Sequence, residues 1–282
     1  MSQNERRIPL IALILGFGLV LASLAVRADS FDHQHTIWNR LLQEHVVWIR
    51  GGVASQVDYA GFAQDRAQLD QYLASLSAVT ESHYQSWNRD QKLAFLINAY
   101  NAFTVQLILD HYPGIDSIKD IGGWFGSPWK KAFFELRGEQ HSLDDIEQTM
   151  IRQHFREPRI HMAVNCASVG CPALADTAYV ASDLNAQLTR AVDRFLSDHR
   201  RNRYDSAART FKVSSIFDWY GDDWNADSGY PQGVRGFLVA HLSRLSSGAT
   251  PPRLEVRGAD IEYLDYDWSL NNLTAGSNEQ TE

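Results

Sequence analysis

The chain has 282 residues, of which 34 are Asp or Glu and 26 are Lys or Arg, so its formal net charge is −8. An acidic chain without a basic stripe argues against nucleic acid or an anionic lipid surface as its partner. The length suits a single domain with a sizeable hydrophobic core. We therefore expect one folded domain whose partner is a small molecule, a peptide or a component of the cell envelope.

The first 28 residues have the three parts of an export signal. Arg6 and Arg7 provide the positive start, residues 8–25 form an apolar run, and Val26-Arg27-Ala28 resembles a cleavage site. We predict a signal peptide over residues 1–28 and a periplasmic or secreted domain, with no stable membrane insertion after signal removal. The alternative is an uncleaved N-terminal anchor, because the run is close to the roughly 18-residue lower limit for a spanning helix.

Apolar residues recur at helical spacing in three early segments of the chain. They predict helices over residues 36–50, 64–76 and 89–111. The third pattern is the strongest and is ended by Pro113 and Gly114. Because this segment is apolar nearly all round, we expect one buried central helix over about residues 89–112.

Two amides, Asn98 and Asn101, lie on this helix beside its apolar face. A buried amide without a hydrogen-bond partner costs roughly 1–3 kcal/mol, so both side chains must find partners. One interpretation is that they hold the backbone of a neighbouring loop. The other is that they line a substrate-binding site together with Tyr100, which lies between them in the sequence.

The rest of the chain mixes short strand and helix patterns. Strands are predicted over residues 132–136, 139–143, 210–213, 254–257 and 261–268, and helices over residues 143–155, 183–198 (capped by Ser182) and 232–245. Arg137-Gly138 makes the turn of a hairpin, and Ser142 with Asp145 resembles a capping box. These patterns predict a helix-rich α+β domain over residues 29–271 around a small mixed sheet, with a disordered tail over residues 272–282.

Residues 159–165 form a short apolar run before the first cysteine. We interpret the run as a buried strand, although a helix would also fit so short an apolar segment. On a strand, His161, Ala163 and Asn165 share one face, and two polar groups around a small residue suggest the surface of a site. The following loop contains Gly170, which allows close backbone approach, and such loops often carry function.

Several short segments together resemble the family known as domain of unknown function 547. They are Phe95–Ala102, His141–Glu147, Arg159–Pro172, Ser215–Tyr220 and Leu264–Asn271. The resemblance covers about residues 57–271 of the chain. It implies one domain in which these segments matter, but the family has no settled activity, so it implies no mechanism and no catalytic assignment.

Cys166 and Cys171 are the only two cysteines of the chain. In an exported protein an even number of cysteines favours a disulfide. So short a loop gains only roughly 2 kcal/mol from closure, which a domain of this size does not need. The spacing also differs from the Cys-x-x-Cys of dithiol oxidoreductases. The pair is therefore a structural disulfide or a functional site.

The enzymatic hypothesis is a thiol-dependent hydrolase or acyl transferase with Cys166 as its nucleophile. Such an enzyme needs a histidine within hydrogen-bond reach and a group that orients it. If residues 159–165 are a strand, His161 lies about 16 Å from Cys166, and His141 is the better base. If they are a helix, His161 can take that role. Asp265 or Asp267 would orient the histidine, and a peptide or cell-wall amide is the expected substrate.

The alternative hypothesis is a non-catalytic binding or structural domain that contains a Cys166–Cys171 disulfide. Candidate substrate-binding residues for either hypothesis are Asn98, Tyr100, Asn101, Asn165 and Trp124. A zinc site built from His161 and the two cysteines matches no familiar ligand spacing. We therefore expect neither a metal nor a cofactor.

Overall fold

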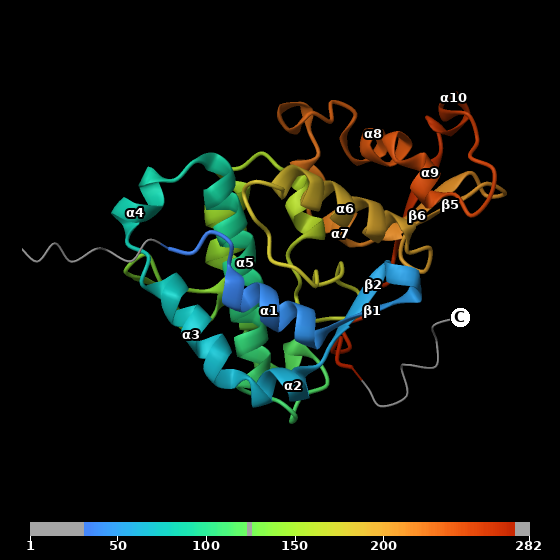
Figure 1. Ribbon diagram of the computed structural model, residues 1–282. Helices are drawn as coiled ribbons and strands as arrows, with labels where there is room; N and C mark the ends of the chain where they lie inside the picture. The colour runs from blue at the N-terminus through green and yellow to red at the C-terminus, as the bar shows by residue number, and fades with distance from the viewer. Residues whose placement is uncertain (1–30, 123–125, 274–282) are drawn as a thin grey trace, which may run out of the picture. The chain divides into compact units, whose positions relative to one another are not determined.

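Helix α5 (Arg89–Leu109) runs through the centre of the first hydrophobic core in the computed structural model, which describes residues 31–122 and 126–273 (Figure 1). Asn88 and Gln91 cap its start with a reciprocal capping box. Every residue from Leu93 to Val105 is buried. Of the described helices, α5 is long and apolar enough to span a membrane, but 89% of its most apolar window is buried inside the protein. The predicted central helix is therefore confirmed.

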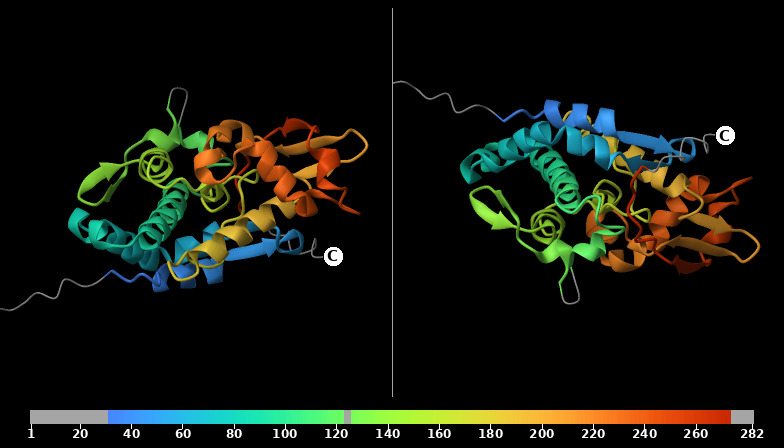
Figure 2. Two further views of the ribbon diagram at one scale, coloured as in Figure 1. Left: turned by 90° about the horizontal axis from the view of Figure 1, so that it is seen from above. Right: turned by 90° about the horizontal axis from the view of Figure 1, so that it is seen from below.

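The N-terminal helices form a layer on one side of α5. They are α1 (Thr36–His45), α2 (Tyr59–Gln64), α3 (Arg66–Ser77) and α4 (Glu81–Ser86). Helices α2 and α3 pack directly on α5, and α1 packs on α2 and α3. The π-helical turn η4 (Asp145–Arg152) packs against a different side of α5 from these helices, as the views from above and below show (Figure 2).

The C-terminal part of the chain surrounds a second hydrophobic cluster. It contains α6 (Leu184–Ser197), α7 (Ile216–Trp219), α8 (Gly233–Ala240), α9 (Leu242–Leu245) and α10 (Arg253–Val256). Its sheet has the order β5 (Arg203–Asp205), β6 (Thr210–Ser214) and β7 (Asp260–Leu264). Strands β5 and β6 are antiparallel whereas β6 and β7 are parallel, so the predicted small mixed sheet is confirmed.

Two hairpins complete the fold. They are formed by β1 (Val46–Ile49) with β2 (Ala54–Val57) and by β3 (Phe134–Leu136) with β4 (Glu139–His141). Arg137 and Gly138 both have positive φ, as a tight turn between β3 and β4 requires, so the predicted hairpin is correct. The capping box is also present, because Ser142 N–H donates to the Asp145 carboxylate and Ser142 Oγ accepts from Asp145 N–H.

The segment that follows β7 ties distant parts of the domain together. Gly170 N–H donates to the Asp267 carbonyl, and Asn271 N–H donates to the Ala167 carbonyl. At its end, Leu273 N–H donates to the Val57 carbonyl, so the described structure continues two residues beyond the end predicted at Asn271. The predicted signal over residues 1–28 and the rest of the predicted tail lie outside the described residues.

The predicted strand over residues 159–165 is wrong. Residues Pro158–Met162 instead form a 3₁₀ turn, η5, in which the Arg159 N–H donates to the Glu157 side chain. Pro158 occupies the first position of the turn, where its missing N–H costs nothing. Residues 160–165 are buried, so the run lacks the alternation that separates a strand from a buried helix.

Several other boundaries differ from the sequence predictions. The helix predicted over residues 36–50 ends at His45, because the β-branched residues that follow pair with β2. The helix predicted over residues 232–245 is divided at His241, and the strand predicted over residues 254–257 is helix α10. Helix α6 begins after Asp183 rather than with a Ser182 cap.

Candidate functional site

The two amides on α5 each bind the backbone of a neighbouring loop. Asn98 donates to the Tyr179 carbonyl at 2.7 Å and accepts from the Tyr179 N–H at 3.0 Å. Asn101 donates to the Ala163 carbonyl at 3.0 Å and accepts from the Asn165 N–H at 2.8 Å. The structure therefore bears out the interpretation that these amides hold the backbone of neighbouring loops. Each side chain pairs with one backbone carbonyl and one backbone N–H, as a neighbouring strand would.

Asn165 organises the cysteine loop from inside. Its Oδ1 accepts from the Ala167 N–H at 2.9 Å, and its Nδ2 donates to the Pro172 carbonyl at 2.7 Å. Gly170 approaches closely, because a Cβ atom at this position would lie 2.8 Å from a ring carbon of Tyr266. The loop is thus held by α5 at its start and by Tyr266 on its surface.

Cys166 and Cys171 form a disulfide within this loop. Both cysteines of the chain are therefore bonded and neither is a thiol. The Tyr266 hydroxyl lies 3.2 Å from Cys166 Sγ and 3.1 Å from Cys171 Sγ. The predicted disulfide is present, and the structure gives no support to a Cys166 nucleophile.

The disulfide forms part of the wall of a pocket of about 240 Å³. Besides Tyr100 on α5, five of the described residues that line it are aromatic: Trp129, Trp219, Tyr220, Tyr266 and Trp268. They come from the segment after residue 125, from α7 and its end, and from the segment after β7. Trp219 stacks on Trp268 with the ring centres 5.7 Å apart. The walls are therefore mostly apolar and converge from three parts of the chain.

His161 lies on the floor of this pocket and is held by an ion-pair chain. Its Nε2 is 2.7 Å from Asp223 Oδ2, and Arg152 binds both oxygens of the same carboxylate at 2.6 and 2.8 Å. Burial raises the pKa of Asp223, but the hydrogen bonds from His161 and Arg152 lower it to about 2. The ring also stacks on Tyr220, with centres 4.0 Å apart. Asp223 is ionised at neutral pH, so His161 carries its proton on Nε2.

The other ring nitrogen of His161, Nδ1, is buried and has no hydrogen-bond partner among the described residues. The nearest carboxylate is that of Glu147, whose Oε1 lies 3.8 Å away. Glu147 is 5% exposed, and burial raises the pKa of its carboxyl group while His161 opposes the rise. An unpartnered ring nitrogen and a buried carboxylate therefore lie beside each other in this part of the pocket.

The structure separates most of the other predicted site residues from this pocket. His141 lies on β4, where its Nδ1 is 3.8 Å from Asp145, and it does not line the pocket. Asp265 and Asp267 line a different cavity beside Arg201. Trp124 lies outside the described residues. Tyr100, His161 and the two cysteines are the predicted site residues that the pocket brings together.

The predicted site residues do not include Glu147, Asp223 or the aromatic wall apart from Tyr100. Asp223 is 62 residues from His161 in the chain, in an acidic turn whose composition alone is typical of a solvated surface. Glu147, Trp219 and Trp268 lie in segments that carried the family resemblance. That resemblance was the available signal that these residues matter. A single sequence, however, does not show which of the segments lie in contact in the fold.

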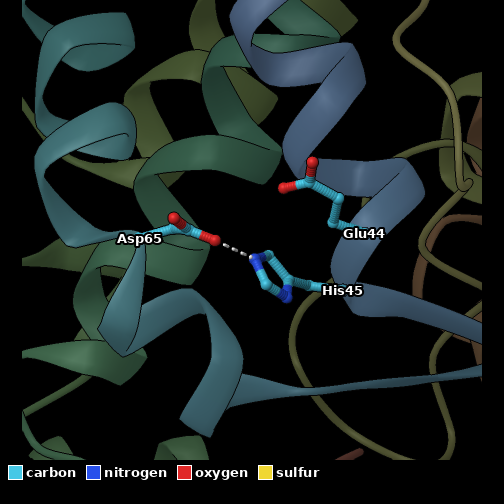
Figure 3. A group of neighbouring side chains, drawn as sticks. All are labelled: Glu44, His45 and Asp65. Atoms are coloured by element: carbon cyan, nitrogen blue, oxygen red, sulfur yellow. Dashed lines mark hydrogen bonds and ion pairs between the residues drawn. The ribbon is translucent and has the colours of Figure 1, made fainter.

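A second group of titratable side chains lies away from the pocket, at the end of α1. Glu44, His45 and Asp65 place their ligand atoms within 4.8 Å of one another (Figure 3). His45 Nε2 is already paired with Asp65 Oδ2 at 2.9 Å, and Glu44 is exposed. An ion pair at the junction of α1 and α3 accounts for this arrangement.

The fold and the site define an α+β domain with a disulfide in the wall of an aromatic pocket. Residues 84–196 match the model of the family described as "Protein of unknown function, DUF547", so the resemblance to that family is confirmed over this part of the chain. The matched residues include α5, Glu147, His161 and both cysteines, whereas Asp223 lies beyond them. No curated protein and no solved structure matches the chain.

Proposed function

We propose that this domain binds a small organic molecule in the aromatic pocket, and that the Cys166–Cys171 disulfide is a fixed, non-catalytic part of the pocket wall. A volume of about 240 Å³ is slightly below the roughly 300–1,000 Å³ of sites for drug-sized ligands. The ligand would therefore be smaller than a drug. Mostly apolar walls with a few convergent polar groups are typical of binding pockets.

The observation that carries this proposal is the buried, unpartnered Nδ1 of His161 on the pocket floor. A buried polar atom without a partner costs roughly 1–3 kcal/mol. A bound ligand that donates a hydrogen bond to this atom would remove that cost. The thiol-dependent reaction considered from the sequence would first require reduction of the disulfide, and no contact in the pocket favours it.

We also propose that the domain works outside the cytoplasm, in the periplasm or as a secreted protein. The proposal rests on the signal-like residues 1–28 and on the disulfide, because disulfides persist mainly in oxidising compartments. Localisation of a full-length fusion, with sequencing of the mature N-terminus, tests it. A cytoplasmic product that keeps residues 1–28 would contradict it, and a membrane-bound product would indicate the uncleaved anchor.

Ligand-observed NMR with a library of small organic compounds tests the binding function. Trp219 is 46% exposed and forms part of the pocket wall, so Trp219→Ala should remove binding while the domain stays folded. Trp48→Ala is the matched control, because Trp48 packs under Arg194 outside this pocket. Compounds that bind the two variants equally well would contradict the proposed pocket.

A further inference from the structure

We propose that the ligand of this pocket is an organic ammonium ion, whose N–H groups bridge His161 Nδ1 and the Glu147 carboxylate while its apolar body packs among the aromatic walls. This inference deepens the proposed binding function and rests on it. It follows from the tautomer of His161, from the charges around Glu147 and from the chemistry of the walls.

The tautomer of His161 is determined by Asp223. The ionised carboxylate 2.7 Å from Nε2 accepts the proton of that nitrogen, and Arg152 keeps the carboxylate in place. In the neutral ring Nδ1 is then a hydrogen-bond acceptor. It faces Glu147 Oε1, which is 3.8 Å away and is too far for a direct hydrogen bond. With the ring neutral, two acceptors lie side by side, and a ligand that donates at least two hydrogen bonds would satisfy both.

No lysine or arginine among the described residues forms an ion pair with Glu147; His161 is 3.8 Å away, and the Tyr100 and Tyr220 hydroxyls lie beside the carboxylate. Arg152 is the nearest arginine on the same turn, but both of its contacts to a carboxylate go to Asp223. Lys130 also lines the pocket, and it opposes the burial-induced rise in the pKa of Asp144. A buried carboxylate is costly unless it is paired. An ammonium ion on the ligand would supply the missing positive charge.

The walls suit the same ligand. Cations are attracted to the faces of Trp and Tyr rings, and the attraction is strongest where water is excluded. The protein itself already uses this contact at the pocket edge, since Lys119 Nζ lies 3.8 Å from the centre of the Trp268 ring. Primary ammonium groups combine this attraction with three N–H donors, which matches the two acceptors on the floor.

Binding should become tighter as the pH rises through the pKa of Glu147 in the free protein. Burial raises that pKa, and only the ionised carboxylate attracts an ammonium ion. Above this range the affinity should become constant until the amine of the ligand loses its own proton. The groups that face Glu147 and contribute to this titration are His161, Tyr100, Tyr220, Tyr266, Asp144 and Arg152.

Isothermal titration calorimetry with three probes of similar size tests the inference. The probes are phenethylamine, the neutral 2-phenylethanol and the anionic phenylacetate. We expect phenethylamine to bind about 10- to 100-fold more tightly than 2-phenylethanol, because hydrogen bonds to a buried charge are strong. Phenylacetate should bind most weakly. Equal affinity for the amine and the alcohol, or a preference for the anion, would overturn the inference.

The substitution Glu147→Gln keeps the shape of the side chain and removes its charge, so it should abolish the preference for the amine. Glu44→Gln is the matched control, because Glu44 is exposed and lies in the separate group at the end of α1. If Glu147→Gln fails to fold, the pH dependence of phenethylamine binding to the unchanged protein decides in its place. An affinity that does not change with pH between 4 and 8 would contradict the bridge.

The same measurements separate failure of this inference from failure of the proposed function. If neutral aromatic compounds bind and Trp219→Ala removes their binding, the pocket is a binding site and only the ammonium inference is wrong. If no probe and no library compound depends on Trp219, both proposals fail.

Discussion

Replacement of Asn101 by alanine should destabilise the domain by disconnecting the cysteine loop from α5. Asn101 is 2% exposed and makes one hydrogen bond to the Ala163 carbonyl and one to the Asn165 N–H. Alanine would leave both backbone groups buried without a partner, at roughly 1–3 kcal/mol each. We expect the free energy of unfolding to fall by about 2–6 kcal/mol in total.

Urea denaturation followed by far-UV circular dichroism measures this change, and the melting temperature should fall by roughly 4–24 °C for a domain of this size. Gln106→Ala is the matched control on the same helix. The Oε1 atom of Gln106 is buried without a hydrogen-bond partner among the described residues, so its removal should cost far less. Asn101→Asp should have an intermediate effect, because it keeps the acceptor for the Asn165 N–H and loses the donor to Ala163.

The reasoning would be refuted if Asn101→Ala were no more destabilising than Gln106→Ala. That result would mean that water or a rearranged loop satisfies the two backbone groups without cost. The pocket should also respond, since residues 163–165 lead directly into the disulfide that forms part of its wall. Ligand binding should therefore weaken together with stability.

Three further predictions follow from the same contacts. Alkylation of the unfolded protein should detect no free thiol before reduction, and Cys166→Ser with Cys171→Ser should lower the free energy of unfolding by roughly 2 kcal/mol; free thiols in the oxidised protein would refute the disulfide. Because Asp223 has a pKa of about 2 when folded and 3.8 as its ordinary value, its ion pairs stabilise the domain above pH 3.8 and are lost as the pH falls towards 2. Between pH 6 and 3, wild type should lose up to about 1 kcal/mol more stability than Asp223→Asn does, as urea denaturation at each pH can show; parallel losses would contradict this. Gly170→Ala should cost about 1–3 kcal/mol by pushing against Tyr266, and an unchanged melting temperature would show that the ring yields freely.

Several features could be predicted because they depend on local sequence. Residues 89–111 are apolar on nearly every side of a helix, and this pattern predicts a buried helix. Helix α5 is that helix. The turn at Arg137-Gly138 and the capping box at Ser142 use residues whose conformational preferences act within four positions. Cys166 and Cys171 are close in the chain, so their pairing needed no knowledge of the fold.

The predictions failed where two structures satisfy the same local pattern. Residues 159–165 form a short apolar segment. Such a segment can be buried either as a strand or as a 3₁₀ turn. Packing of η5 against α6 favours the turn, which directs His161 towards Asp223 instead of along a strand. The acidic turn around Asp223 likewise has the composition of a solvated surface until Arg152 and His161 are placed beside it.

The sequence by itself determined the class of the fold, the central helix and the resemblance to the family, because each depends on periodicity or on residues that are near in the chain. Only the tertiary structure decided where the site lies. The pocket joins His161 to Glu147, to Asp223 and to aromatic residues from α7 and from the segment after β7. Contacts between residues so far apart depend on how the elements pack, and a single sequence carries no separate signal for that packing.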